Sequence, residues 1–365
     1  MAETYLIFSC FLLIFFAWKQ PLNGRAYPFV GVSCLYGIWL LANGELLVDS
    51  VTISLIAVTV WFLVSIIWSE STYSVFEFFL WCSYFLLFTA ARKVSTEFVM
   101  YLLLPVGIFL SLAQFHLQYK YRDKYLHKAW KRFPVFGNSN HNAAFLCLTF
   151  YAALWLALNV SNYFYAASAI IGAAVLQTKC RGGIAGLILS VILFMSIIEP
   201  EILIYSAVLF LVFGVLNIGK IINGSYRDRI VIYRDAIKRI HPRWLTGRGL
   251  NYFRELKYGR VHNDILEIIG ETGLVGLALL VALFAQISFT PVILCCLVCF
   301  LIHGMVFFPL REVHTAAPFW AIMGSAATPV YNNSMWILKG VSVLAIVFVL
   351  IFIFTVFTNL VNHKG

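Results

Sequence analysis

Long apolar runs recur along almost the whole chain, and short polar connections separate them. A helix needs roughly 20 apolar residues to span a bilayer, and helices satisfy their own backbone hydrogen bonds in lipid. We therefore predict an all-α polytopic integral membrane protein with about 12–13 transmembrane helices and one large polar extracytoplasmic loop. We expect spans at about 4–18, 28–48, 51–68, 74–90, 98–118, 143–161, 163–177, 183–198, 201–218, 265–285, 291–308, 315–330 and 336–358.

Composition agrees with this class. Of the 365 residues, 62% are hydrophobic and 12% are charged, whereas soluble domains carry roughly 25% charged residues. The formal net charge of +10 is concentrated in a few loops, which indicates an anionic partner at one membrane face and argues against nucleic acid as a partner. Seven of the eight cysteines lie in apolar runs, so neither a disulfide nor a metal framework is predicted.

The longest polar connection, 219–264, holds eleven of the 26 Lys and Arg residues. The polar connections at 119–142, 178–182 and 309–314 are separated from it and from one another by pairs of spans. All four therefore face the same side of the membrane. We divide the chain into N-terminal helices (1–118), helices with basic loops (119–218), the large loop (219–264) and C-terminal helices (265–365).

Within the large loop, the segment 226–240 predicts an amphipathic helix that lies on the membrane surface. Its apolar face is formed by Ile230, Tyr233, Ile237 and Ile240. Arg229 is adjacent to this face and precedes Tyr233 by four residues, so packing would hold it inward. A solvated or headgroup-binding face explains most of the other cations of this helix.

Two polar motifs stand at the starts of expected spans. In the first, FGNSNHNA at 136–143, Asn142 can cap a helix, while Asn140 and His141 offer donors and acceptors. A plain polar cap explains His141 equally well. In the second, TKCRGGIAG at 178–186, Arg181 presents a fork of donors suited to phosphate beside two glycines. Snorkelling to lipid headgroups is the commoner role of an isolated arginine at such a boundary.

The segment VHNDILEIIGETGLVG at 261–276 is the most informative. Asp264 and Glu267 have capping-box spacing, so a helix is expected to begin there with His262 at its mouth. Glu267 and Glu271 lie one turn apart in an apolar span and need partners. Glycines at 270, 273 and 276 would let another helix approach closely. A lone histidine at a boundary is usually an interfacial polar residue, but here Asn263, Asp264 and many arginines surround it.

Four stretches together resemble the O-antigen ligase superfamily, which includes O-antigen ligases, O-antigen polymerases and pilin oligosaccharyltransferases. They are GNSNHNAAFL, KCRGGIAGL, RIVIYRDAI followed by HPRWLTGRGLNYF, and HNDILEIIGETGLVGL. The resemblance covers roughly 130–330. It departs from the family pattern where Cys180 replaces the usual Ser, where Tyr233 replaces Trp, and where a further span, 336–358, follows the usual last one.

The resemblance implies a glycosyltransferase of the bacterial inner membrane whose large loop faces the periplasm. Its donor is a glycan on undecaprenyl pyrophosphate, and it uses neither metal nor cofactor. The family motifs fall on Arg181, Arg229 and His262, which are therefore the expected catalytic residues. The acceptor is a glycan, lipid A–core or a protein. We assign substrate binding to Asn140, Asn142, Asn263, Arg248, Arg260 and Glu267, and we expect membrane lipids as further partners.

The residues suit this chemistry. Sugar transfer from a lipid pyrophosphate requires charge neutralisation on the leaving group, for which arginine is suited, and deprotonation of an acceptor hydroxyl, for which a neutral histidine is suited. No carboxylate pair in a polar loop has the spacing of a glycosidase nucleophile and acid, so we expect direct, inverting transfer. A transporter or flippase of anionic lipid-linked sugars is the alternative, because a basic vestibule and intramembrane acids would serve it equally well.

The orientation of the loop can be tested with a reporter. Span parity collects 23 of the 26 Lys and Arg residues on the side of the large loop, and the positive-inside rule alone would place that side in the cytoplasm. A pyrophosphate substrate on the outer face gives these loops a different reason to be basic, so we follow the family topology. We expect a reporter fused within 219–264 to register the periplasm. A cytoplasmic signal would refute this orientation.

Overall fold

The computed structural model describes residues 1–17, 22–43, 49–120, 136, 138–199, 225–256 and 259–327, and all regular structure within them is helical. The expected spans at 201–218 and 336–358 lie outside these residues. The α-helices are α1 (Ala2–Ala17), α2 (Leu22–Ala42), α3 (Ser50–Ser65), α4 (Ser74–Ala91), α5 (Thr96–Lys120), α6 (Ser139–Asn159), α7 (Phe164–Gln177), α8 (Arg181–Ile198), α10 (Ser225–Ile240), α11 (Asp264–Phe284), α12 (Pro291–Gly304) and α13 (Val313–Ala326).

Six helical segments in the described part of the chain are long and apolar enough to cross a membrane. They are Ser50–Trp68, Ser74–Ala91, Thr96–His116, Ser139–Asn159, Arg181–Ile198 and Asp264–Phe284. Shorter apolar helices occur at Ala26–Ala42, Phe164–Gln177 and Pro291–Gly304. The all-helical class predicted from the apolar runs is therefore confirmed for the described residues, and the helices fit a membrane protein with several spans.

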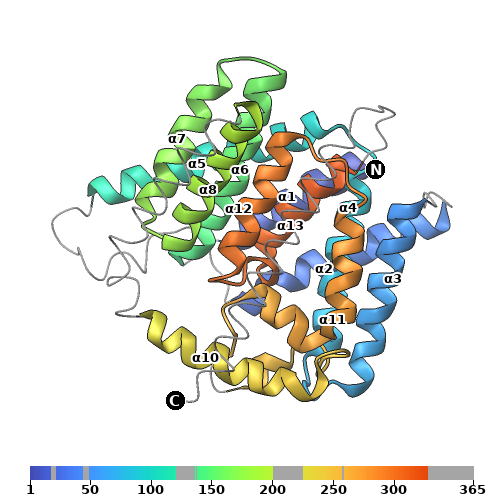
Figure 1. Ribbon diagram of the computed structural model, residues 1–365. Coiled ribbons are helices and arrows are strands. Elements are labelled where there is room, and N and C mark those ends of the chain that lie inside the picture. Colours follow the sequence, from blue (N-terminus) through green and yellow to red (C-terminus); the bar gives the residue numbers. More distant parts are fainter. Residues whose placement is uncertain are drawn as a thin grey trace.

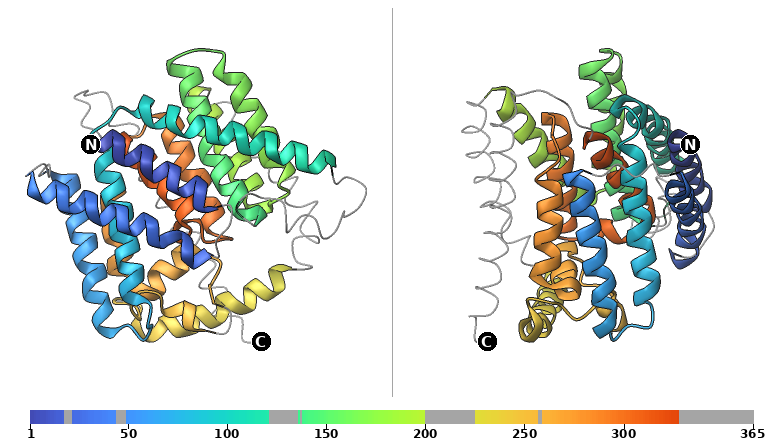
Figure 2. Two further views of the ribbon diagram at one scale, coloured as in Figure 1. Left: turned by 180° about the vertical axis from the view of Figure 1, so that it is seen from behind. Right: turned by 90° about the vertical axis from the view of Figure 1, so that its right-hand side faces the viewer.

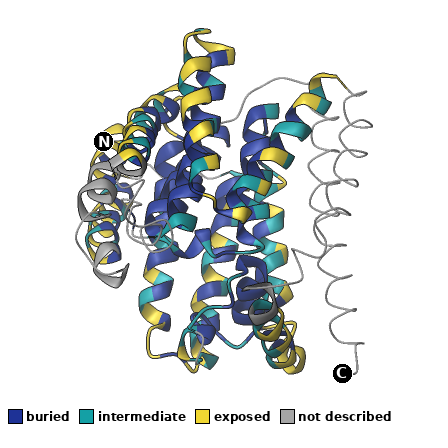
Figure 3. Ribbon diagram, turned by 90° about the vertical axis from the view of Figure 1, so that its left-hand side faces the viewer, coloured by how far each residue is buried: buried dark blue, intermediate teal, exposed yellow. Residues whose placement is uncertain are grey.

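The helices differ in how far they are buried. In α6, 83% of the apolar window is buried, whereas in the α3 segment only 33% is buried. Figure 3 shows the same contrast between central and outer helices. Because α6 is apolar around its whole circumference, it can be surrounded by other helices, while α3 leaves much of its apolar surface for lipid.

The polar loop closes one end of the bundle. In Figure 1, α10 lies across the lower ends of the upright helices, and Figure 2 shows α3, α4 and α11 running side by side above it. The predicted amphipathic helix at 226–240 is confirmed as Ser225–Ile240. Ala236, Ile237 and Ile240 are buried against the loop residues Tyr252 and Phe253, so this end of the apolar face packs on protein, whereas Ile230 at the other end is 43% exposed.

The helix α11 is broken in its middle at Gly273, where φ is 72° and ψ is −177°. The loop that follows α10 inserts at the break. The N–H groups of Leu274 and Val275 donate to the carbonyls of Trp244 and Leu245 at 2.9 and 3.2 Å. In return, two loop N–H groups, those of residues 248 and 249, donate to the carbonyls of residues 270 and 271, both at 2.8 Å. The loop therefore satisfies backbone groups that the break exposes.

This break corrects the expectation that the glycines of α11 serve the approach of another helix at two of the three positions, whereas a Cβ on Gly276 would lie 3.3 Å from the side chain of Trp61 in α3. A Cβ on Gly273 would lie 1.9 Å from the carbonyl oxygen of Leu245, which belongs to the loop. A Cβ on Gly270 would meet the ring of Phe253, another loop residue, at 2.2 Å. The glycines at 270 and 273 thus admit the polar loop rather than a second transmembrane helix.

Two expected helix caps are also displaced. The cap of α6 is Asn138, whose side chain accepts from the N–H of residue 140, and Asn142 instead lies buried inside the helix. The cap of α11 is Asn263, whose Oδ1 accepts from the N–H of Leu266 at 3.0 Å. Asp264 was expected to cap this helix, but its Oδ2 accepts from the N–H of Leu310 at 3.0 Å. Tertiary contacts decide which of several adjacent polar residues caps each helix.

We predict that Gly273→Ala destabilises the protein strongly. The substitution places a Cβ in a left-handed conformation and in contact with the Leu245 carbonyl, and backbone strain of this kind costs about 1–3 kcal/mol before any steric overlap. The matched control is Gly31→Ala, because a Cβ there meets nothing within 4 Å. Thermal unfolding in detergent micelles would measure both variants. Equal midpoints for the two variants would contradict the structural role of the break.

Candidate functional site

The turn 305–308, between α12 and the short 3₁₀ helix Pro309–Arg311, is the point where several of the sequence motifs meet. The carbonyl of Met305 accepts from the Tyr233 hydroxyl at 3.1 Å and from Nδ2 of Asn263 at 3.0 Å. The carbonyl of Val306 accepts from Nη1 of Arg229. One turn therefore holds α10 and the start of α11 together, because its carbonyls are not used within a helix.

Arg229 is half-buried on α10 and faces this turn. Its position inside the protein agrees with the expectation that packing would hold it inward. Its positive charge acts on both His262 and Cys180. It adds to the burial that lowers the pKa of His262, and it partly opposes the burial that raises the pKa of Cys180. Arg229 therefore lies within electrostatic reach of two of the sequence motifs, although they are far apart in the chain.

His262 directly precedes the cap of α11 and has a left-handed backbone, with φ of 59°. Its carbonyl accepts from the Tyr233 hydroxyl at 3.0 Å, and its ring lies 5.1 Å from the ring of Phe308. Its Nδ1 atom is buried and has no hydrogen-bond partner among the described residues. These contacts fix the backbone of His262 and leave one ring nitrogen without a protein partner.

The environment of His262 favours the neutral imidazole. Burial lowers the pKa of His262 below its usual value of 6.5, and the nearby charge of Arg229 lowers it further, while Glu267 acts in the opposite direction. A charged imidazolium is disfavoured because it would lose hydration and face a guanidinium. His262 is therefore neutral at pH 7, which is the state that a general base requires.

Arg181 is the first residue of α8, and its side chain is exposed. No hydrogen bond or ion pair joins it to Arg229 or His262 within the described residues. The start of α8 nevertheless abuts the same turn, since a Cβ on Gly182 would lie 2.4 Å from a side-chain methyl of Val306. The structure thus brings the backbone near Arg181 to the turn 305–308 and leaves its guanidinium accessible.

Cys180 links the start of α8 to α6. Its Sγ accepts from the N–H of Gly183 at 3.4 Å and donates to Oδ1 of Asn140 at 3.0 Å. It also lies 3.6 Å from Nε2 of His303. Burial raises the pKa of the Cys180 thiol, so it stays protonated, which allows it to donate. Cysteine in place of serine therefore keeps the capping role at this position.

The asparagines expected to bind substrate make contacts within the protein. Nδ2 of Asn142 donates to Oε1 of Gln114 at 3.0 Å, and Asn263 bridges α11 to the turn 305–308. Asn140 accepts from Cys180. These side chains order the starts of three helices around the turn. Asn142 keeps a buried Oδ1 with no hydrogen-bond partner among the described residues.

The structure separates Arg248 from His262. Its Nε donates to the carbonyl of Arg239 at 3.0 Å, its guanidinium lies 5.5 Å from the ring centre of Tyr252, and Glu70 lies 3.8 Å away. These contacts belong to the far part of the loop, near the insertion at Gly273. Arg248 thus fastens the loop to the bundle.

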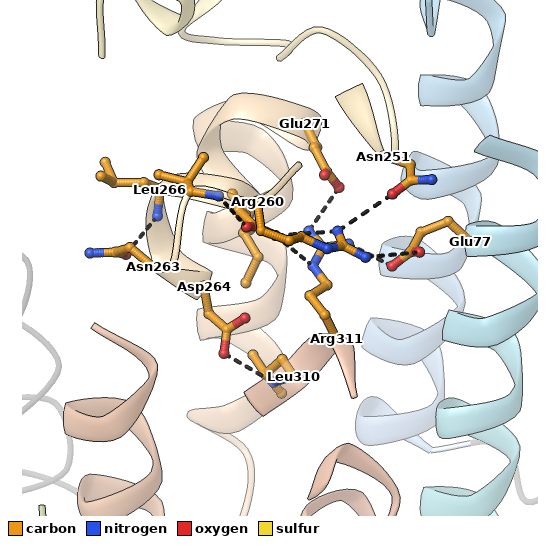
Figure 4. Close-up of polar contacts among 12 residues, drawn as sticks. Glu77, Asn251, Arg260, Asn263, Asp264, Leu266, Glu271, Leu310 and Arg311 are labelled. Atoms are coloured by element: carbon orange, nitrogen blue, oxygen red, sulfur yellow. Dashed lines mark hydrogen bonds and ion pairs between the residues drawn. The ribbon is translucent and has the colours of Figure 1, made fainter. Parts of the chain in front are cut away.

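Arg260 and Glu267 belong to a buried ionic network centred on Arg311, and Figure 4 shows Arg260 and Arg311 side by side in it. Arg311 donates from Nη1 to Oε1 of Glu77 at 2.8 Å and from Nη2 to Oε2 of Glu271 at 2.7 Å. Its Nε lies 3.5 Å from Oε2 of Glu267. The two groups form an ion pair, but the N–H is not aligned for a hydrogen bond. Arg260 lies 3.4 Å from the same Glu267 oxygen and 4.0 Å from Glu77.

The network holds more acid than base. Two guanidinium groups face three glutamates, and the carboxylate of Asp264 lies beside Leu310, next to Arg311 in sequence. The side chains of Arg311, Glu267 and Glu77 are at most 3% exposed. Charges buried within a membrane protein are costly and mark functional or structural centres.

Sequence reasoning assigned no role to Arg311 or Glu77. A signal for Glu77 existed, because it is the one charged residue within the apolar run 74–91 and an intramembrane carboxylate demands a partner. The partner could not be identified from spacing, since Arg311 follows 234 residues later. The two glutamates of α11 were expected to need partners, and Arg311 pairs with both.

No protein-family model matches this chain, and no curated protein matches it either. The resemblance to the O-antigen ligase superfamily accordingly rests on the four motifs and on their arrangement.

We predict that Arg311→Met destabilises the protein by about 3–5 kcal/mol, which is typical when one partner of a buried ion pair is removed and the other charges remain. Chemical denaturation in detergent micelles would measure the loss. The control is Arg234→Gln, because Arg234 is exposed on α10 and such a change costs less than about 0.5 kcal/mol. Adding Glu77→Gln to Arg311→Met should restore part of the stability. If Arg311→Met matched the control, the network would have no structural role.

Proposed function

We propose that this chain is a membrane glycosyltransferase of the bacterial inner membrane, which moves a glycan from an undecaprenyl-pyrophosphate carrier to an acceptor hydroxyl at the periplasmic face. The transfer is direct and inverting, and protein side chains alone perform it. The acceptor classes that fit are lipid A–core in ligation, a growing glycan in polymerisation, and a protein.

The observation that carries this proposal is the shared attachment of Arg229 and His262 to the turn 305–308. Arg229 donates to the carbonyl of Val306, while Tyr233 donates both to Met305 and to His262. Arg229 contributes to lowering the pKa of His262, so a phosphate-binding cation and a neutral base lie in one electrostatic environment. A pyrophosphate leaving group and an acceptor hydroxyl require these two groups together.

In the proposed step, the acceptor oxygen attacks the anomeric carbon from the face opposite the pyrophosphate. The C–O bond to the carrier breaks, and its electron pair leaves with the pyrophosphate. The acceptor proton passes to the unprotonated ring nitrogen of His262 and later to solvent. Arg229 and the accessible guanidinium of Arg181 neutralise charge on the leaving group, which preorganised donors do with little reorganisation.

A transporter of anionic lipid-linked sugars is the second candidate, and the buried network favours it. Carboxylates outnumber guanidiniums around Arg311, and carboxylates inside a membrane bundle mark ion pathways and proton relays in transporters. Purified protein in liposomes separates the two candidates. A transferase forms the product glycan with donor and acceptor on the same side, whereas a transporter moves intact donor across the bilayer without forming product.

We predict that His262→Ala lowers kcat by 10²–10⁴-fold, the usual contribution of a general base, with KM for the donor little changed. The matched control is His241→Ala, because His241 is an exposed histidine of the same loop. The assay is transfer from a lipid-linked donor by purified protein, or the band pattern of surface glycans in a complemented deletion strain. Near-normal transfer by His262→Ala would refute the base assignment.

The pH profile gives a second reading of the same variant. Burial and Arg229 lower the pKa of His262 below 6.5, the usual pKa of a histidine side chain. The imidazole therefore stays mostly neutral as the pH falls to 6.5, and it is protonated only at lower pH. The acid limb of kcat/KM, which reports the free enzyme, should therefore have its midpoint below pH 6.5 and should be absent from the residual rate of His262→Ala. A midpoint above pH 6.5 would contradict this environment.

A further inference from the structure

Two histidines and a glutamate converge where α6 and α13 begin. Nδ1 of His141 lies 2.7 Å from Nε2 of His314 and 3.7 Å from Oε2 of Glu312. The three potential ligand atoms lie within 4.8 Å of one another. His141 belongs to α6, whereas Glu312 and His314 are separated from it by more than 170 residues, so the fold, and not local sequence, brings these groups together.

The surroundings of this trio are aromatic and closely packed. The ring of Phe136 stacks on His314 with centroids 4.4 Å apart and an interplanar angle of 18°. The ring of Phe307 approaches His141 edge-on at 4.9 Å. Both histidines are buried, and the Glu312 side chain is only 12% exposed. The aromatic shell restricts the imidazole rings and keeps the dielectric low, and such a shell controls solvent access at metal sites.

We propose that His141, Glu312 and His314 bind a divalent cation of the zinc type. Two imidazoles and one carboxylate are a donor set that Zn²⁺ takes with a fourth position left for water. Carboxylate and imidazole together are poor ligands for Mg²⁺ and Ca²⁺, which prefer oxygen alone. The low-dielectric surroundings strengthen the attraction between the carboxylate and a dication.

The geometry requires a small adjustment. Zn–N bonds of about 2.0–2.1 Å in a tetrahedral arrangement separate two ligand nitrogens by about 3.3 Å. The His141–His314 pair, at 2.7 Å, must therefore open by about 0.6 Å, and the widest pair of ligand atoms, up to 4.8 Å apart, must close by as much as about 1.5 Å. In the metal-free state, a proton lies between the two nitrogens. When the ion binds, that proton moves to the other nitrogen of its own ring. The lone pairs of His141 Nδ1 and His314 Nε2 then both bind the ion.

The bound ion acts as a clamp between helix starts. It joins α6, which carries Asn140 and Asn142 near its start, to the segment 312–314 that follows the turn 305–308. The residues that we propose for glycan transfer are not ligands of the ion, so the clamp does not depend on the proposed function. A protein with either of the two candidate functions would use it in the same way.

The test uses the purified full-length protein in detergent after treatment with a chelator. We expect Zn²⁺, followed by desalting and elemental analysis, to give one ion per chain, and Co²⁺ to give the visible absorption bands of a four-coordinate site. His314→Gln should weaken Zn²⁺ binding by more than the 10–100-fold that is usual for outer-shell changes. The control is His241→Ala, which removes an exposed histidine and should leave one ion bound.

A second variant covers the case in which His314→Gln fails to fold. Glu312→Gln keeps the size of the side chain and removes its charge, so it should also weaken Zn²⁺ binding. Fewer than one ion per chain, or an ion that is retained with unchanged affinity in folded His314→Gln or Glu312→Gln, would overturn the proposal, and the pair would then be a plain hydrogen bond between helices.

Discussion

The structure depends on one constraint, which is that backbone polar groups inside an apolar bundle must find partners. The chain interrupts α11 at Gly273 and leaves N–H and carbonyl groups open there, and residues 244–249 of the polar loop supply the matching groups. The same constraint operates at the end of α12, where the carbonyls of Met305 and Val306 accept from side chains of α10 and α11. A loop that would otherwise be mobile is therefore fastened to the membrane helices at two places.

Between these two places, the ionic network around Arg311 sets the position of the segment 260–263. Glu267 accepts from the N–H of Val261 at 2.8 Å and pairs with Arg260 and Arg311. Arg311 in turn pairs with Glu77 on α4, so the loop, α4 and α11 share one set of charges. A buried ion pair adds little net stability, but it penalises every arrangement in which a partner is missing. Because Arg260 and Val261 both contact Glu267, this penalty fixes the backbone that carries His262.

Sequence patterns predicted those features of the fold that depend on residues close together in the chain. The periodicity of 226–240 identified α10 and the inward position of Arg229, and the polar residues at 262–264 identified the start of α11. The caps of α6 and α11 lie one to four residues before the predicted positions. Asp264 accepts a hydrogen bond from Leu310 and Asn142 donates one to Gln114, and both partners are distant in sequence. Gly270 and Gly273 were interpreted as a helix contact, since spacing cannot distinguish the approach of a helix from the insertion of a loop. The pairing of Glu77 with Arg311 and of His141 with His314 depends on tertiary contacts that no window of sequence contains.

His262 shows how these constraints fit the proposed function. A non-glycine residue with a left-handed backbone costs about 1–3 kcal/mol unless its neighbours hold it there. The neighbours do so on both sides, since the N–H of Val261 donates to Glu267 and Asn263 caps α11. Glycine at 262 would relieve the strain and preserve both backbone contacts, but it would remove the ring that lies 5.1 Å from the ring of Phe308. In the proposed function the same side chain has a second role, because its neutral imidazole would accept a proton beside a guanidinium that the turn 305–308 holds in place.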